Sequence, residues 1–158
     1  MVLRGRITVP GDKSISHRAL LIASISQGFS VIQGFSSAHD CLATLECCRK
    51  LGAVIEEHSN NTIVVHGKGL FSLKEPQDIL DCKNSGTTMR LLSGILAGQE
   101  FFSVVTGDSS LRSRPMGRVV VPMRQMGAVI QGRKQGNLPP LAVEGGGLEG
   151  ITYTLPVA

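Results

Sequence analysis

The chain repeats itself after about 75 residues, since the tetrapeptide Gly-Ala-Val-Ile at 52–55 recurs at 127–130. Two further features recur in the second copy: Arg18 corresponds to Arg90, and the glycine-containing turn at 67–70 corresponds to the one at 145–148. The three features follow one another in the same order in both copies. Three anchors in one order predict two copies of a single supersecondary unit. A chain of this kind must bury the apolar helix stripe of each copy against its neighbour, because one unit cannot bury it alone.

Apolar periodicity predicts what each copy contains. Unit one, about 11–75, and unit two, about 76–150, both read as β-α-β-α-β-β. The predicted fold class is therefore α+β (an α/β repeat), with helices packed inside and sheets outside. Thr154-Leu155-Pro156 resembles Thr8-Val9-Pro10 at about twice the period. This predicts that a third unit starts at 151–158 and that the chain is an incomplete lobe of a truncated protein.

The individual elements follow from periodicity and from turn residues. The predicted helices are 14–27, 38–51, 86–97 and 116–126. The predicted strands are 3–9, 29–34, 53–55, 62–65, 78–82, 101–106, 128–131, 140–143 and 151–155. The turn at 59–61 predicts a hairpin, Gly28 is expected to cap the first helix, and Pro122 to delay or bend the fourth.

Helix ends and faces can be assigned in the same way. The second helix has several candidate N-caps, namely Ser36, Ser37 and Asp40. Its predicted apolar stripe consists of Leu42, Leu45 and Cys48. The fourth helix has its apolar residues at helical spacing, namely Met116, Val119, Val120, Met123 and Met126.

Two polar loops run directly into apolar helices, and they point to anion binding. The first, at 11–18, contains Lys13, Ser14 and Arg18, and the second, at 84–90, contains Asn84 and Gly86. A helix N-terminus presents unpaired N–H groups and the positive end of the helix dipole, which favour phosphates and carboxylates. If the first helix starts near Ser14, Ser14 and Arg18 share a face, with Lys13 at the mouth. Ordinary capped helices with incidental basic residues are the alternative.

A third polar segment, at 107–116, brings Arg114 to the start of a helix. The planar guanidinium suits two-point binding of a carboxylate or phosphate. If the two units pack side by side, Arg114 is expected to reach the same pocket as Lys13.

Composition excludes several other classes. With five Phe, one Tyr and no Trp, the chain lacks the rings of a platform for single-stranded nucleic acid. The net charge of +4 comes from dispersed Lys and Arg, which argues against nucleic acid as a partner. No apolar run approaches a membrane span. Four cysteines without metal-site spacing predict free thiols, no metal and a cytoplasmic location.

The loops carry a specific resemblance. Residues 10–18 (Pro-Gly-Asp-Lys-Ser-Ile-Ser-His-Arg) resemble the N-terminal signature of the 5-enolpyruvylshikimate-3-phosphate synthase family. Residues 84–90 (Asn-Ser-Gly-Thr-Thr-Met-Arg) and 114–117 (Arg-Pro-Met-Gly) resemble its second and third signatures. The sister enolpyruvyl transferase of cell-wall synthesis has Lys-Asn where this chain has Lys13-Ser14, and it needs a reactive cysteine that the 107–116 loop lacks.

The resemblance implies a function and its residues. The family transfers the enolpyruvyl group of phosphoenolpyruvate to the 5-hydroxyl of shikimate 3-phosphate, in the shikimate pathway of aromatic amino-acid biosynthesis, with no metal or organic cofactor. It implies that Lys13 contacts both substrates and that Ser14 and Arg18 bind shikimate 3-phosphate. Asn84, Gly86 and Arg114 would line the phosphoenolpyruvate site, and glyphosate would be an inhibitor acting near Gly86.

Length separates this chain from the family. The resemblance implies six units in two lobes, and the second lobe, with its acid/base carboxylates and further arginines, is absent here. Its partner would be the remainder of its own chain, and the fragment alone is expected to be inactive. The alternative is a non-catalytic anion-binding module that uses the same loops.

Overall fold

The computed structural model describes residues 4–155, which form two units joined by a connection near residues 69–79. The elements of the first unit are α1 (Lys13–Ile25), β1 (Gln27–Ile32), α2 (His39–Lys50), β2 (Val54–His58) and β3 (Thr62–Lys68). Its sheet is antiparallel, with the strand order β1-β3-β2.

The second unit has a four-stranded sheet. Its elements are β4 (Leu80–Asp81), α3 (Gly86–Ala97), β5 (Phe102–Thr106), a 3-10 turn (Leu111–Ser113), α4 (Gly117–Gln125), β6 (Val129–Arg133) and β7 (Leu138–Glu144). The strand order is β4-β5-β7-β6, and β4 is parallel to β5 whereas the other pairs are antiparallel. Among the described residues, the first sheet has no strand beside β1 that corresponds to β4.

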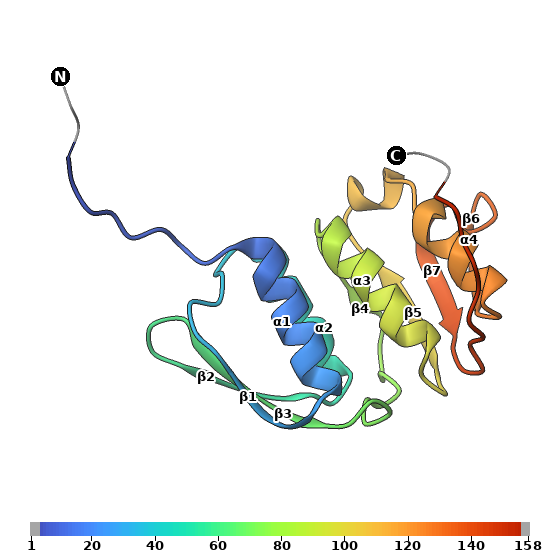
Figure 1. Cartoon of the computed structure of the whole chain (residues 1–158). Coiled ribbons are helices and arrows are strands. Elements are labelled where there is room, and N and C mark those ends of the chain that lie inside the picture. Colours follow the sequence, from blue (N-terminus) through green and yellow to red (C-terminus); the bar gives the residue numbers. More distant parts are fainter. Residues whose placement is uncertain (1–3, 156–158) are drawn as a thin grey trace.

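The helices α1, α2 and α3 lie between the two sheets, which face outward on opposite sides of the molecule (Figure 1). Their inner faces and the inner faces of both sheets form one continuous core, to which each unit contributes fully buried leucines: Leu20, Leu45, Leu92 and Leu141. The predicted α+β architecture, with helices inside and sheets outside, is confirmed.

The repeated tetrapeptide has the same structural task in both units. Gly52 follows α2 and Gly127 follows α4, with φ of +83° and +101°, a conformation that side chains with a Cβ rarely adopt. The predicted helix 86–97 is confirmed as α3, and the hairpin turn is confirmed between β2 and β3, with Asn60 and Asn61 at positive φ.

Two of the predicted strands are wrong in the described part of the chain. Residues 4–9 are extended but pair with nothing, and Ile7 and Val9 are 85% and 70% exposed. Their alternating pattern suits a strand, but a strand needs a neighbour, and this segment leads away from the first sheet (Figure 1). Residues 151–155 are not a strand either; residues 3 and 156–158 lie outside the described residues.

Several predicted helix ends also differ. Helix α1 ends at Ile25 with Ser26 as its C-cap, and Gly28, although its φ is +97°, lies inside β1. The N-cap of α2 is Ala38, whose methyl side chain cannot accept a hydrogen bond, so the predicted N-caps Ser36, Ser37 and Asp40 are wrong; Asp40 lies in the first turn and pairs with Lys13.

The two predicted apolar stripes are only partly correct. Leu42 is 38% exposed, whereas Leu45 and Cys48 are buried. Of the stripe predicted for α4, only Met116 and Val120 are buried. Helix α4 begins at Gly117 and includes Pro122, so the predicted late start is wrong. The other three residues of the predicted stripe, Val119, Met123 and Met126, are half-buried.

Candidate anion-binding site

Helix α1 starts at Lys13 because Asp12 caps it. The Asp12 carboxylate accepts a hydrogen bond from the N–H of Ile15 at 2.7 Å. The loop before the cap packs tightly against residues 34–36, since a Cβ on Gly11 would lie 1.7 Å from the Gly34 carbonyl oxygen. Glycine is therefore required at position 11, and the loop holds the helix N-terminus in a fixed place.

The three residues predicted on this helix all face solvent. The Lys13 ammonium lies 2.7 Å from Asp40 Oδ2, and this hydrogen bond raises the pKa of Lys13. Ser14 and Arg18 lie one turn apart on α1, as their spacing predicted, and both are exposed. Within residues 4–155, Arg18 has no ion-pair partner.

The second loop is built in the same way. Ser85 is the N-cap of α3, and its hydroxyl accepts from the N–H of Thr88 at 3.1 Å. Asn84 lies between two partners: its Nδ2 donates to Asp108 at 2.7 Å, and its Oδ1 accepts from Arg114 at 2.5 Å. The hydrogen bond from Asn84 lowers the pKa of Asp108, which is therefore held ionised.

Gly86 lies beneath two guanidinium groups. A Cβ at this position would lie 2.6 Å from Nη1 of Arg90 and 3.4 Å from Nη1 of Arg114. Burial, then the charges of Arg114 and Arg118, lower the pKa of Arg90. Neither Arg90 nor Arg114 has a carboxylate partner in the described part of the chain. Positive charges gathered at a helix N-terminus, over a residue with no side chain, favour a small bound anion.

The structure links the two loops without joining Lys13 directly to Arg114. A pocket of about 410 Å³ lies between them, lined by His39, Asp40, Asp81, Lys83, Asn84, Gly107 and Asp108. Asp40 is the partner of Lys13 and Asn84 is the partner of Arg114, so each loop reaches this pocket through a neighbour. A larger hollow of about 580 Å³ lies at the other end of α3 and is lined mainly by apolar residues.

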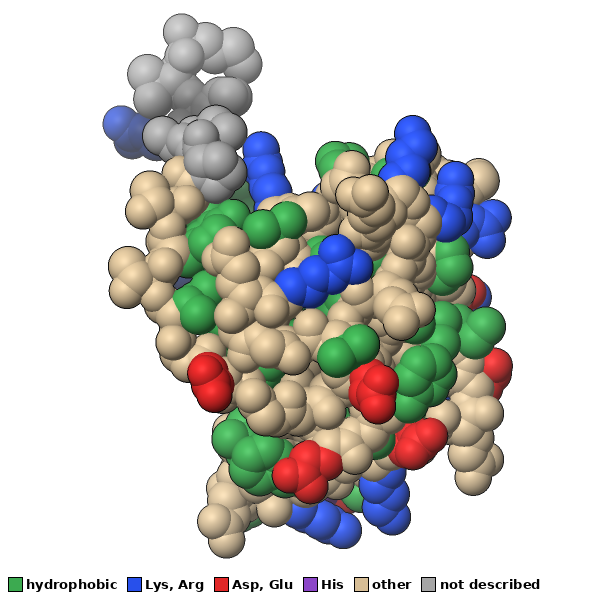
Figure 2. Space-filling view, turned by 90° about the vertical axis from the view of Figure 1, so that its right-hand side faces the viewer, with side chains coloured by type: hydrophobic (Ala, Val, Ile, Leu, Met, Phe, Trp, Pro, Cys, Tyr) green, Lys and Arg blue, Asp and Glu red, His purple; other side chains and the backbone are tan. Residues whose placement is uncertain are grey.

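The distribution of charge agrees with the position of the loops. Many of the Lys and Arg side chains on the face shown in Figure 2 lie toward the end of the molecule where α1 and α3 begin. Most of the Asp and Glu side chains visible on that face lie in its lower half, together with some further Lys and Arg side chains.

Three further side chains of the candidate site were not predicted in these positions. Asp40 was assigned only as a possible cap, Asp108 was not singled out, and Arg90 served only as a repeat marker. Only Arg90 carried a signal, because it lies four residues after Gly86 and therefore on the same helix face. The partners of Lys13 and Asn84 lie 27 and 24 residues away in sequence, so only tertiary packing reveals them.

The remaining features of the described residues add no second site. All four cysteines are buried free thiols. Among residues 4–155, none of the helices combines the length and the apolar character that crossing a bilayer requires.

Known proteins of one family are similar to this chain along its length, including both loops. The profile of EPSP synthase (3-phosphoshikimate 1-carboxyvinyltransferase) matches residues 1–158. The 3-phosphoshikimate 1-carboxyvinyltransferases of Pelotomaculum thermopropionicum and Synechococcus sp. (strain JA-3-3Ab) are each 58% identical over 99% of this chain. The chain spans 36% and 35% of their own lengths.

A solved structure gives the same result for the fold. EPSP synthase from Acinetobacter baumannii superposes with a TM-score of 0.93 and 48% identity, over 98% of this chain and 35% of that one. The match runs along the whole chain and includes both loops. This chain therefore belongs to the EPSP synthase family.

Proposed function

We propose that this chain supplies part of the active site of an enolpyruvyl transferase. The reaction moves the enolpyruvyl group of phosphoenolpyruvate to the 5-hydroxyl of shikimate 3-phosphate and releases phosphate. The observation that carries the proposal is the pair of helix N-termini beside cations without carboxylate partners among the described residues, Arg18 on α1 and Arg90 and Arg114 at α3. Both substrates are anions, and relatives that bear the name of this activity match throughout.

Each side chain then has a distinct task. Ser14 and Arg18 bind the phosphate of shikimate 3-phosphate at the start of α1, and Lys13 lies between the two substrates with Asp40 holding its ammonium in place. Asn84, Gly86 and Arg114 line the phosphoenolpyruvate side, where Asn84 orients the guanidinium of Arg114. Glyphosate, which carries a phosphonate and a carboxylate, competes at this second place.

The proposal also gives a role to the part of the protein outside this chain. The chain spans about a third of its relatives' length, so the remainder of the protein closes over both loops and supplies the acid and base. The buried free thiols suit a reducing compartment, and we place the reaction in the cytoplasm.

Calorimetric titration with shikimate 3-phosphate tests the first half-site. Arg18→Ala is expected to weaken binding by about tenfold or more, because a charge-assisted hydrogen bond to phosphate is lost. Arg133→Ala is the control: Arg133 lies on β6, where it donates to the carbonyl oxygen of Pro139, and its loss should leave the affinity unchanged. Equal affinities for the wild-type protein and Arg18→Ala would contradict the assignment.

A further inference from the structure

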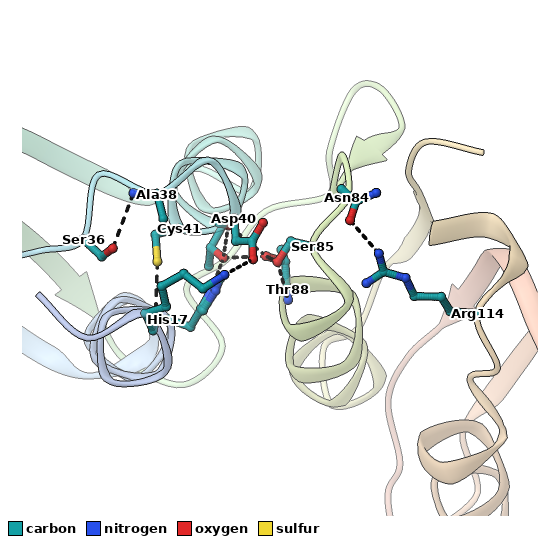
Figure 3. A network of polar contacts seen from close by, with 11 residues as sticks. His17, Ser36, Ala38, Asp40, Cys41, Asn84, Ser85, Thr88 and Arg114 are labelled. Carbon is teal, nitrogen blue, oxygen red and sulfur yellow. Dashed lines mark hydrogen bonds and ion pairs between the residues drawn. The ribbon is translucent and has the colours of Figure 1, made fainter. Parts of the chain in front are cut away.

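A buried row of polar side chains passes beneath both loops (Figure 3). His17 Nδ1 on α1 lies 2.6 Å from Thr44 Oγ1 on α2, and that oxygen lies 2.7 Å from Thr88 Oγ1 on α3. The Thr88 hydroxyl in turn lies 2.6 Å from the hydroxyl of Ser85. All four side chains are at most 1% exposed. The row thus crosses from unit one to unit two through the core.

Both ends of the row coincide with the candidate site. His17 immediately precedes Arg18 and lies one turn after Lys13, and Ser85 is the N-cap that precedes Gly86. The row is also anchored to Asp40, whose backbone oxygen accepts hydrogen bonds from Thr44 at 3.3 Å and from Thr88 at 3.2 Å. The side chain of the same residue holds Lys13.

Packing alone does not account for hydroxyl groups at these positions. Apolar side chains of the same size would join three helices without the cost of burying polar atoms. A buried row of polar side chains is tolerated only if every member is hydrogen-bonded, and the row then favours a single arrangement of the elements that carry it. Here that arrangement is the separation and orientation of two helix N-termini.

From this geometry we infer that His17, Thr44 and Thr88 are positioning residues, whose hydrogen-bond row couples the loop of Lys13 and Arg18 to the loop of Ser85 and Gly86. The inference rests on the proposed function, in which these loops bind the two substrates. None of the three positioning residues needs to touch a substrate, because each acts through a neighbour that does.

Proton counting shows how the row transmits a change. A hydroxyl has one proton, so each member can donate to only one neighbour at a time. When His17 is protonated, its Nδ1–H must donate to Thr44, whose own proton then goes to Thr88 or to the Asp40 carbonyl. When the neutral ring carries its proton on Nε2, Thr44 donates to Nδ1 instead, and Thr88 can then donate to Thr44 in place of Ser85. The hydroxyl of Ser85, and with it the start of α3, senses the difference.

The charged and polar groups that face His17 come from three helices. Lys13 and Arg18 come from α1 and Asp40 comes from α2, while α3 contributes the hydroxyls of Thr88 and Ser85. Burial is the largest effect and lowers the pKa of His17 from its usual 6.5, so the ring titrates on the acidic side of that value.

Nuclear magnetic resonance titration of the 158-residue protein tests the row without any ligand. The His17 ring and the Gly86 amide are followed from about pH 8 to about pH 5. The Gly86 amide should shift with the same midpoint as His17. In Thr44→Val, which keeps the shape and removes the hydroxyl, His17 should still titrate while Gly86 no longer follows it.

The controls separate positioning from packing. Thr44→Ser keeps the hydroxyl and should restore the response of Gly86. Ser93→Ala removes another buried hydroxyl of α3, one that bonds only the Met89 carbonyl within the same helix, and should leave the response intact. Thr88→Val breaks the row at its next member and replaces Thr44→Val if that protein does not fold. A Gly86 amide that ignores His17 in the wild-type protein, or follows it equally in both valine variants, overturns the inference.

Addition of shikimate 3-phosphate extends the test to function. In the wild-type protein, the amide groups of Ser14 and Gly86 should both shift, and Thr44→Val should abolish the shift at Gly86 alone. If Ser14 does not shift, the proposed substrate site fails while the pH titration still decides on the row. If Ser14 and Gly86 both shift in Thr44→Val, the coupling fails while the site stands.

Discussion

At the scale of single residues, Gly86 is the position where space matters most. Its φ is not in the left-handed region, so alanine is tolerated by the backbone, but the new Cβ would meet Nη1 of Arg90 at 2.6 Å. We expect Gly86→Ala to change the free energy of unfolding by less than about 1 kcal/mol. Displacement of the guanidinium groups should weaken phosphoenolpyruvate binding by about tenfold, as measured by calorimetry or by amide shifts in α3.

Gly94→Ala is the matched control on the same helix. A Cβ at Gly94 would have nothing within 4 Å, so alanine should stabilise the protein by about 0.5–1 kcal/mol and leave anion binding alone. Weaker binding in both variants would show that helix stiffness, rather than the space under the arginines, controls affinity.

The second prediction at this scale concerns His17 and acid. Burial lowers the pKa of His17 below 6.5, so the unfolded chain takes up a proton before the folded protein does. The free energy of unfolding should therefore fall as the pH drops through about 6.5 toward the pKa of the folded state. Urea unfolding near pH 7.5 and pH 5.5 should show a smaller loss for His17→Asn than for the wild-type protein.

Ser93→Ala, which removes a buried hydroxyl but no titratable group, provides the comparison. Its loss on acidification should match that of the wild-type protein. An identical loss in His17→Asn would mean that His17 does not titrate differently in the folded and unfolded chains.

The positions of the site residues on their helix could be predicted from the sequence, whereas their ion-pair and hydrogen-bond partners could not. Lys13 lies at the start of a helix and Ser14 and Arg18 lie one turn apart on it, as their spacing predicted, because helix periodicity is local. The ion pair with Asp40 and the Asn84–Asp108 hydrogen bond depend on which loops the two units bring together. No spacing rule contains that information.

At the scale of elements, the helix starts differ in quality. Asp12 caps α1 and Ser85 caps α3, whereas the N-cap position of α2 is held by Ala38, with φ −60° and ψ 141°. That backbone suits a capping side chain, so Ala38→Ser should stabilise the protein by about 0.5–1 kcal/mol in urea unfolding.

Ser37→Ala is the control for this change. Ser37 is exposed and precedes the cap position, so its loss should have no measurable effect on unfolding. Stabilisation by neither Ala38→Ser nor Ala38→Asp would argue that the first turn of α2 is already satisfied by solvent.

The elements themselves could largely be predicted, and their exceptions have a common cause. Helix α3 follows from a clear cap and a clear apolar face, and the hairpin of β2 and β3 follows from its Asn-Asn turn. The segment at 4–9 has the alternation of a strand but no neighbour, and Leu42 has the spacing of a core residue but no covering element. A pattern records a preference for burial, while the presence of a partner depends on the rest of the molecule.

At the scale of the whole molecule, binding and turnover should separate. The three carboxylates that line the pocket between the loops are each held by a neighbour: Asp40 by Lys13, Asp81 by Lys83 and Asp108 by Asn84. We therefore expect no phosphate release by the 158-residue protein from shikimate 3-phosphate and phosphoenolpyruvate, although shikimate 3-phosphate binds. Release above the uncatalysed rate would place the acid and base within this chain.

The repeat made the whole-molecule architecture predictable, since two similar units with apolar helix stripes must pack those stripes together. What the repeat could not reveal is that the units are unequal. Unit two has β4 beside β5, whereas none of the residues at 4–155 forms a strand in the corresponding place beside β1. Sequence similarity between units reports a shared fold, but the last strand of a sheet can be left out without changing any of the repeated residues.

This difference between the two sheets affects the solubility of the protein. In the part of the chain that the structure describes, strand β1 pairs with β3 on one side only, and it exposes Phe29 and Val31 beside a row of backbone donors and acceptors. Such an edge can take up a strand from another molecule while each molecule remains folded. Aggregation at high concentration or during long storage would then start from β1, at temperatures well below the one at which the core unfolds.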